Sequence, residues 1–474
     1  MSNEEEVWSL VEGKRDRFFA LSDRIWETPE LNYEEYRSSA EQVAMLKSQG
    51  FRVSVGLAGL PTAVMGEAGT QGPVIAILGE FDALPGLSQQ AGIAEKRPVR
   101  DGANGHACGH NLLGSGSLMA ATAVKDYLER HGLEGRIRYY GCPAEEGGSA
   151  KGFMVRAGVF DDVDIAISWH PAAFAGVNNP ISLACNEILF RFTGRASHAA
   201  STPHLGRSAL DAVELMNVGV NYLREHMPSS ARVHYAVTDT GGSAPNVVQA
   251  KAAVRYLVRA RDLPELQALV ARVEKVAAGA ALMTETSVER EVLSGDANLI
   301  ANPPLEALMF QHLQRLGPPA FDAEDRAFAA NIQSTLSAED IAASAARFGL
   351  KPKKGVALCD VIFPLGSGDG TLVGSTDVGT VSWVVPTVQM RGATYAIGTP
   401  GHSWQLVAQG KAPAAHKGME HAAKVMASTA VDLILRPELI EAAKADHRER
   451  LAETPFVNPI PDGVQPPLPE KSRG

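Results

Sequence analysis

Several residues that could hold a metal ion lie in one short, glycine-rich stretch, DGANGHACGHNLLGSG, at residues 101–116. Asp101, His106, Cys108 and His110 fall within ten positions, immediately before a segment of helical character. Thiolate, imidazole and carboxylate groups are good ligands for Zn²⁺, and the last two also suit Mn²⁺. Because a lone buried cysteine is usually just a small hydrophobic side chain, this stretch does not by itself establish a metal site.

Groups of the same chemical kind follow predicted strands elsewhere in the chain. Asp82 follows VIAILGEF, the pair Glu145 and Glu146 follows RIRYYGC, and His170 follows DIAIS. His402, in TPGHSWQ, is a further candidate ligand. In an open α/β sheet the carboxyl ends of the strands line one crevice, where ligands bind. We therefore expect these side chains and the HACGH residues to meet in one site.

The glutamate pair indicates what such a site would do. Two adjacent glutamates are usually solvated, but this pair stands at a strand end beside two glycines. Burying one carboxylate next to another is unfavourable unless cations neutralise them. Two cations roughly 3.5–4 Å apart can hold a water and lower its pKa to about 7. One glutamate then binds metal while its neighbour serves as general base, which favours a two-metal hydrolase of amide bonds.

The elements that must position these residues are those of an α/β domain. Helical periodicity covers residues 7–26, 33–49 and 111–131, and strand-like runs cover 51–54, 62–66, 74–81, 136–140 and 164–168. Strands that alternate with helices predict a layered α/β domain. We expect a mixed, mostly parallel sheet with helices on both faces.

A second pattern begins near residue 181 and ends near residue 293. Strands and helices follow there in the order β-α-β-β-α-β, which is a split βαβ, ferredoxin-like α+β unit that can bury its own core. We predict an inserted domain at 186–296 between two parts of a catalytic domain, 1–185 and 297–474. Helices near 305–316, 338–348 and 418–435 belong to the second part.

Composition excludes several classes of protein. The chain of 474 residues is 45% hydrophobic and 21% charged, with a net charge of -10 and no block of Lys and Arg, which argues against nucleic-acid binding. Its four cysteines form no CxxC pair, as is usual in a reducing compartment. The acidic N-terminus is unlike a signal peptide, and no apolar run approaches the roughly 18 residues of a membrane span. We expect a soluble, cytoplasmic protein.

The motifs HACGHN, PAEEGG and SWHP, in this order, resemble those of the M20 metallopeptidase family, and the HACGH form resembles its amidohydrolase branch. The resemblance covers nearly the whole chain and implies two divalent metal ions, Zn²⁺ or Mn²⁺. The implied ligands are Cys108, His110, Glu146, His170 and His402. It makes Glu145 the general base and Asp82 the residue that orients a ligand. Glu80 stands where most of the wider family has a ligand histidine, and its role is open.

The resemblance also assigns the inserted domain as a lid that usually forms a dimer. It implies His198, in GRASHAASTP, as the group that stabilises the tetrahedral oxyanion. Asn246, in GGSAPNVVQA, is implied as a substrate or oxyanion contact.

Members of this branch cleave N-acyl amino acids, commonly an aromatic acyl group on Glu or Asp. Arginine binds such carboxylates in a bidentate manner, and Arg391 is the first candidate for this role. Arg207 and Lys417 are weaker candidates. Arg259 ends a strand, and we interpret it as a structural residue of the small domain.

These observations lead to more than one functional hypothesis. The first is a dinuclear-metal amidohydrolase of N-acyl amino acids, with p-aminobenzoyl-glutamate as the expected substrate. Such an enzyme would be a homodimer or pair with a paralogous chain, with no nucleic acid or membrane as partner. The second is a non-catalytic or weakly active subunit of a heteromeric hydrolase, although the presence of every implied ligand favours activity. A dipeptidase or a deacylase of another acyl preference is a third.

Overall fold

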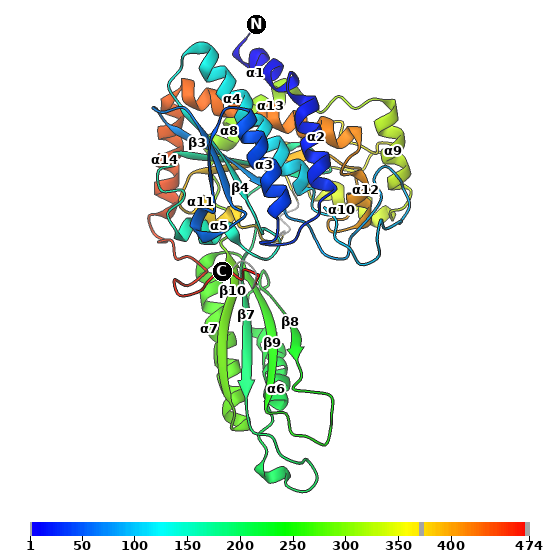
Figure 1. Ribbon diagram of the computed structural model, residues 1–474, viewed down its shortest axis with the longest axis vertical. Helices are drawn as coiled ribbons and strands as arrows, with labels where there is room; N and C mark the ends of the chain where they lie inside the picture. Colours follow the sequence, from blue (N-terminus) through cyan, green and yellow to red (C-terminus); the bar gives the residue numbers. More distant parts are fainter. Residues whose placement is uncertain (1, 369–373, 470–474) are drawn as a thin grey trace.

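A mixed sheet of seven strands runs through the larger part of the molecule in the computed structural model, which describes residues 2–368 and 374–469 (Figure 1). Its strand order is β1-β2-β4-β3-β5-β11-β6. The bounds are β1 Arg52–Val55, β2 Val64–Ala68, β3 Val74–Glu80, β4 Arg136–Cys142, β5 Ile165–Ala172, β6 Gly176–Val177 and β11 Thr387–Ala393. The central strands β4, β3, β5 and β11 are parallel, whereas the pairings made by β1, β2 and β6 are antiparallel. The predicted sheet type is therefore confirmed.

Strand β3 shows why both faces of this sheet must be covered. All of its residues, VIAILGE, are buried. Side chains alternate between the two faces of a strand, and Ile75 and Ile77 belong to one hydrophobic cluster whereas Ala76 and Leu78 belong to another. Helices lie over both faces, as predicted.

One face is covered by helices from both ends of the chain. They are α1 Asn3–Glu12, α2 Arg15–Trp26, α3 Tyr36–Ser48, α4 His110–His131, α8 Pro303–Leu316, α13 Pro413–Leu435 and α14 Pro437–Leu451. Helix α4 packs on the central strands and beside α13. A Cβ atom added to Gly114 would lie 2.5 Å from the backbone oxygen of Glu80, so the close approach of α4 to β3 requires glycine there. This approach brings the first turn of α4 to the carboxyl end of β3.

Shorter helices complete this part of the molecule. Helices α5 Ala150–Arg156 and α11 Val378–Ser382 contact each other and cover the opposite face. Helices α9 Ala323–Gln333, α10 Ala338–Ala346 and α12 Trp404–Gln409 lie at the side of the sheet, where a separate apolar cluster joins them to the β5–β6 region (Figure 1).

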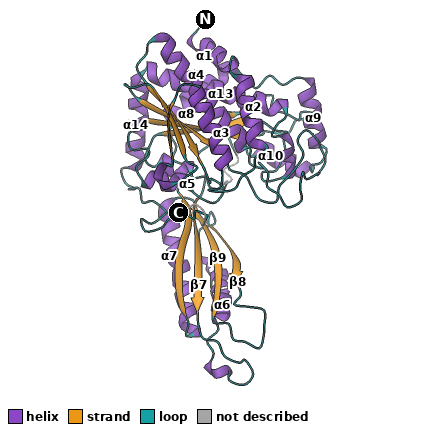
Figure 2. Ribbon diagram, in the orientation of Figure 1, coloured by secondary structure: helices purple, strands orange, loops and turns teal. Residues whose placement is uncertain are grey.

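A second, four-stranded antiparallel sheet of order β10-β7-β9-β8 extends away from the first (Figures 1 and 2). Its elements are β7 Ala184–Thr193, α6 Ala209–Leu223, β8 Arg232–Asp239, β9 Lys251–Ala260, α7 Leu263–Thr284 and β10 Ser287–Asp296. Both helices lie on one face and share a buried cluster with the sheet (Figure 2). The predicted β-α-β-β-α-β order is confirmed. We call this unit the lid, and we retain 186 and 296 as its proposed boundaries.

The structure corrects several local predictions. The helix expected over 7–26 is divided into α1 and α2, because Gly13 caps α1 with its backbone N–H directed to Ser9 and Val11. His170 does not follow β5 but lies inside it, because β11 continues the parallel pairing as far as Ala172. Helices α9 and α14 were not predicted, since each buries only a narrow face. Within the described ranges, no helix is both long and apolar enough to cross a bilayer.

Candidate active site and metal centre

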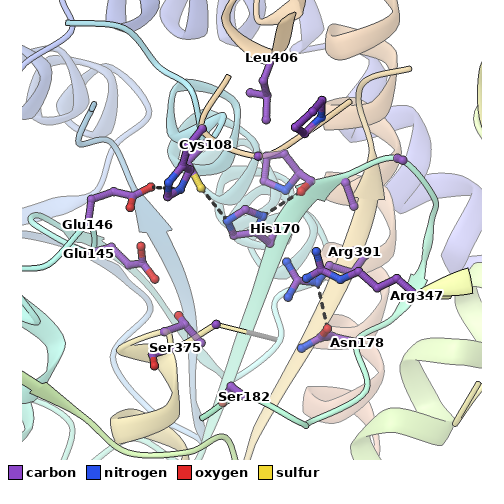
Figure 3. A pocket seen from close by; sticks show the side chains of 18 of the residues that line it. Cys108, Glu145, Glu146, His170, Asn178, Ser182, Arg347, Ser375, Arg391 and Leu406 are labelled. Carbon is purple, nitrogen blue, oxygen red and sulfur yellow. Dashed lines mark hydrogen bonds and ion pairs between the residues drawn. The ribbon is translucent and has the colours of Figure 1, made fainter. Parts of the chain in front are cut away.

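The implied ligands come together at the carboxyl ends of the central strands (Figure 3). Cys108, Glu145, Glu146, His170 and His402 line one pocket, and His110 is fully buried behind it. His110 is the first residue of α4, and Gly109 before it has a φ of 81°, which favours glycine. The His402 backbone, with a φ of 55°, donates a hydrogen bond to the Ala107 carbonyl at 3.0 Å. Such non-glycine conformations concentrate at functional sites, and here one fastens the His402 loop to the HACGH loop.

Two groups of possible ligand atoms share one thiol. Cys108, His110 and His170 offer atoms that all lie within 4.8 Å of one another, and so do Cys108, Glu146 and His402. A third group, Glu80, His110 and Glu145, meets the same distance limit without a thiol. Cys108 Sγ lies 3.3 Å from His170 Nε2, and His402 Nε2 lies 3.2 Å from Glu146 Oε1. Each of these two groups therefore has the ligand chemistry to hold a divalent cation.

The protonation behaviour of these groups fits cations. Burial raises the pKa of the Cys108 thiol even though the charge of His110 opposes this, so a thiolate needs additional positive charge there. Burial, followed by the charge of Arg391, lowers the pKa of His170 well below its usual value and leaves a neutral imidazole. His110 Nε2 and Glu80 Oε2 lie 3.3 Å apart, and neither of these buried atoms forms a hydrogen bond among the described residues. Buried polar atoms without a hydrogen bond are rare in proteins, and a metal ion would satisfy His110 Nε2.

Asp82 lies where it can orient a ligand. Its Oδ1 is 2.8 Å from His110 Nδ1, and its Oδ2 accepts the backbone N–H of Glu146 at 2.8 Å. Burial alone would raise the pKa of Asp82, but the charge of His110 and these hydrogen bonds outweigh it and lower the pKa. An ionised Asp82 holds the proton on Nδ1 of His110 and so directs Nε2 toward the centre.

Glu145 differs from Glu146 in its surroundings. Its Oε2 lies 3.9 Å from His110 Nε2, and its side chain points into the pocket (Figure 3). Burial, then the charges of Glu80 and Glu146, raise the pKa of Glu145 well above its usual value. A carboxylate with raised proton affinity that faces the reacting centre has the property of a general base.

Glu80 is part of a buried ionic cluster that the sequence did not indicate. Its Oε2 lies 3.3 Å from His110 Nε2, while its Oε1 accepts a hydrogen bond from Lys151 Nζ at 2.6 Å. The same ammonium group lies 2.6 Å from Asp377 Oδ1, and all three side chains are buried. Lys151 follows the PAEEGG motif, where an isolated lysine resembles a surface cation, and its partner Asp377 is far away in sequence.

The pocket also has a cationic wall. Arg391 lies on it, as predicted, and Arg347, at the C-terminal end of α10, was not predicted. Arg259 also lines the pocket, whereas we had interpreted it as structural. The weaker candidates lie elsewhere: Arg207 pairs with Glu285 in the lid, and Lys417 pairs with Asp322 and Asp325.

The lid residues do not join this cluster within one chain. His198 and Asn246 are absent from the pocket lining and lie beside each other, since His198 bridges to Val247 and the Ala199 N–H donates to the Asn246 carbonyl at 2.9 Å. They lie in the loops that follow β7 and β8, and both of these strands run away from the first sheet (Figure 1).

Two candidates of the opening stretch have other positions. His106 is buried with Nε2 3.0 Å from the Ile25 carbonyl, and burial lowers its pKa to about 4. It therefore packs as a neutral side chain against α2. Asp101 is exposed at a turn and does not line the pocket.

This fold and this set of donors define the class of the protein as a metal-dependent hydrolase of amide bonds. Comparison with known proteins agrees. The model of the peptidase family M20/M25/M40 matches residues 76–348. The chain therefore belongs to this family, which confirms the resemblance that HACGHN, PAEEGG and SWHP predicted.

Individual relatives are similar over about half to nearly all of their length. The chain is 48% identical to one of the two subunits of the p-aminobenzoyl-glutamate hydrolase of Escherichia coli, over 96% of this chain and 97% of the relative. The other subunit of the same enzyme is 32% identical over 48% of this chain and 53% of the relative. The Xaa-Arg dipeptidase of Mus musculus is 29% identical over 94% of this chain and 93% of the relative. Among solved structures, a dinuclear metal-binding M20 peptidase of Bacillus subtilis shares the fold, with a TM-score of 0.57 and 18% identity over 90% and 99% of the two chains.

Proposed function

We propose that the chain hydrolyses p-aminobenzoyl-glutamate to p-aminobenzoate and glutamate with the help of two divalent metal ions. The observation that carries this proposal is the Cys108 thiol, which belongs to two groups of ligand atoms, with the Glu145 carboxylate beside them. The name of the 48% identical relative supports this substrate.

One metal would be held by Cys108, His110 and His170 and the other by Cys108, Glu146 and His402. Sulfur and imidazole ligands favour Zn²⁺, while the nitrogen and oxygen ligands also permit Mn²⁺. Two such cations, when bound, would supply Lewis-acid chemistry: they would polarise the scissile carbonyl and lower the pKa of a water.

The protein groups then move the protons. Glu145 accepts a proton from the attacking water and afterwards delivers it to the amide nitrogen, so that glutamate leaves as an amine. Asp82 keeps the Nδ1 proton on His110 throughout, which holds the ring in place. Glu146 and Glu145 are adjacent in sequence, yet the first is directed to His402 and the second to the side of His110.

The direct test is release of p-aminobenzoate by the purified chain, first stripped of metal and then supplied with Zn²⁺ or Mn²⁺. We expect turnover only after metal addition, with two ions bound per chain. Turnover that is absent although two metals are bound would support the non-catalytic role instead. A chain that neither binds metal nor turns over the substrate would contradict the site.

We further propose that the lid joins two chains, the partner being a second copy or a paralogue. Apolar side chains are exposed on α6 and on β8, the edge strand of the lid sheet: Leu215, Val218, Tyr222, Tyr235 and Val237. Clustered exposed apolar side chains and an open sheet edge are features of association surfaces. In a dimer of this kind His198 and Asn246 of one chain would serve the active site of the other.

This arrangement predicts complementation between two inactive chains. We expect His198→Ala to lose about 10²–10³-fold in kcat, the usual loss when an oxyanion donor is removed. A dimer of one His198→Ala chain and one Glu145→Ala chain, isolated with two affinity tags, contains one site with both groups intact. It should regain about half of the activity, whereas His204→Ala, in the same exposed loop, should stay active alone. If the mixed dimer is inactive, His198 does not act across the interface.

We infer a cytoplasmic location from the sequence. All four cysteines are free thiols, which supports a reducing compartment. Fractionation of cells followed by the p-aminobenzoate assay would test the location.

A further inference from the structure

Two arginines share one wall of the active-site pocket. Arg391 lies on β11 directly opposite His170 of β5 in the parallel register, and Arg347 lies at the C-terminal end of α10. In Figure 3 their guanidinium groups lie together, across His170 from Glu145 and Glu146. The pocket therefore has the metal ligands on one side and two cations on the other.

These cations have no counter-charge in the described ranges. Neither guanidinium forms an ion pair with a carboxylate there. Asp340, on the same helix as Arg347, also lines the pocket, but its carboxylate accepts hydrogen bonds from the Ser337 backbone N–H and hydroxyl at 2.9 and 2.8 Å. Burial, and after it the charge of Arg347, lowers the pKa of Arg391 to about 10. Two guanidinium groups that repel each other in a pocket are stabilised when an anion enters.

The two arginines differ in how firmly they are held. Arg391 is half-buried, and its Nε donates to Asn178 Oδ1 at 2.9 Å, while Asn178 Nδ2 donates to Gln389 Oε1 at 2.9 Å. This chain of hydrogen bonds fixes the guanidinium and leaves its terminal nitrogens to the pocket. Arg347 is exposed, follows the last turn of a helix, and packs only loosely over the Phe348 ring at 5.9 Å.

From this difference we propose that Arg391 binds the α-carboxylate of the substrate and that Arg347 binds the carboxylate of its side chain, so that Arg347 selects acidic amino acids. The α-carboxylate is one carbon away from the scissile nitrogen, and it therefore needs the fixed cation beside His170. A glutamate side chain reaches further outward, where α10 places Arg347. A substrate with a basic side chain would meet two like charges here. The proposal rests on the proposed function, because it assumes that the amino-acid half lies on this wall.

The test compares p-aminobenzoyl-glutamate with p-aminobenzoyl-glutamine, which has the same shape but a neutral side chain. For Arg347→Gln we expect kcat/KM to fall about 30-fold with the glutamate substrate, as for loss of a charged hydrogen bond, and to change less than about threefold with the glutamine one. Arg391→Gln should lower both values by a similar factor. Arg326→Gln, on the exposed surface of α9, is the matched control and should change neither.

A binding measurement separates this inference from the proposed function. Calorimetric titration of the metal-loaded protein with both compounds needs no turnover, and Arg347→Gln should weaken only the binding of p-aminobenzoyl-glutamate. If Arg347→Gln selectively weakens the binding of p-aminobenzoyl-glutamate but the protein hydrolyses neither compound, the proposed function is refuted and the proposed role of Arg347 stands. Normal hydrolysis, with Arg347→Gln affecting both compounds equally or neither, would overturn the subsite and keep the function.

Discussion

Glu145→Gln should lower kcat by about a thousandfold, within the range for removal of a general base, and leave two metal ions bound per chain. The amide has nearly the same shape as the carboxylate, but it cannot accept the proton of the attacking water. Metal binding should persist, because Glu145 belongs to neither of the two groups that contain the Cys108 thiol; the group that it forms with Glu80 and His110 has no thiol, and Lys151 already binds Glu80 in that group. The rate of p-aminobenzoate release and the metal content of the same preparation provide the two measurements.

Substitution of the adjacent Glu146 should affect metal binding, unlike substitution of Glu145. Glu146→Gln removes a carboxylate that lies 3.2 Å from His402 Nε2, so it should lower metal content as well as rate. Cys108→Ala should lower the metal content further, because the Cys108 thiol belongs to both groups of ligand atoms. Cys359→Ala is the matched control, since Cys359 is buried in a separate apolar cluster and should keep both metals. If Glu145→Gln lost metal like Glu146→Gln, Glu145 would be a ligand and the base would have to be another group.

The convergence of the ligands was predictable because it depends on local signals. Each of Asp82, Glu145 and His170 is close to the end of an apolar strand, and parallel strands bring such ends to one edge. Their pairwise contacts were not predictable, and neither was the continuation of β5 through Pro171. That continuation depends on the ladder with β11, which is more than 200 residues away in the chain.

The residues that could not be predicted from the sequence contact partners that are distant in the chain, and their neighbours in the sequence form no recognisable motif. Arg347 ends a short helix whose sequence indicates only packing, and it reaches the pocket because α10 lies beside the β5–β6 region. His198 and Asn246 were singled out by motif, but a motif does not state which chain's active site they serve. Because the lid extends away from its own catalytic domain, the active site that these two residues serve depends on how chains associate (Figure 1).

Lys151 is the position where we expect the largest loss of stability. Its ammonium group bridges Glu80 and Asp377 at 2.6 Å each, and all three side chains are almost inaccessible to solvent. Burial opposes the charge, yet the two carboxylates raise the pKa of Lys151 well above its usual value, so the ammonium form persists in the native protein. Lys151→Met leaves two buried carboxylates without a cation, and breaking a buried ion pair in this way costs about 3–5 kcal/mol.

Urea unfolding of the metal-free protein, followed by circular dichroism, measures this loss in the free energy of unfolding. The control is Lys353→Met, because Lys353 also pairs with a carboxylate, Asp360 at 2.8 Å, but both side chains are exposed. Exposed pairs contribute about 0–1 kcal/mol. Equal losses for the two variants would mean that the buried cluster stabilises the protein no more than a surface ion pair does. If the cluster is charged, the triple variant Lys151→Met, Glu80→Gln, Asp377→Asn should regain most of the free energy of unfolding that Lys151→Met alone loses. The reason is that no uncompensated charge then remains buried beside His110.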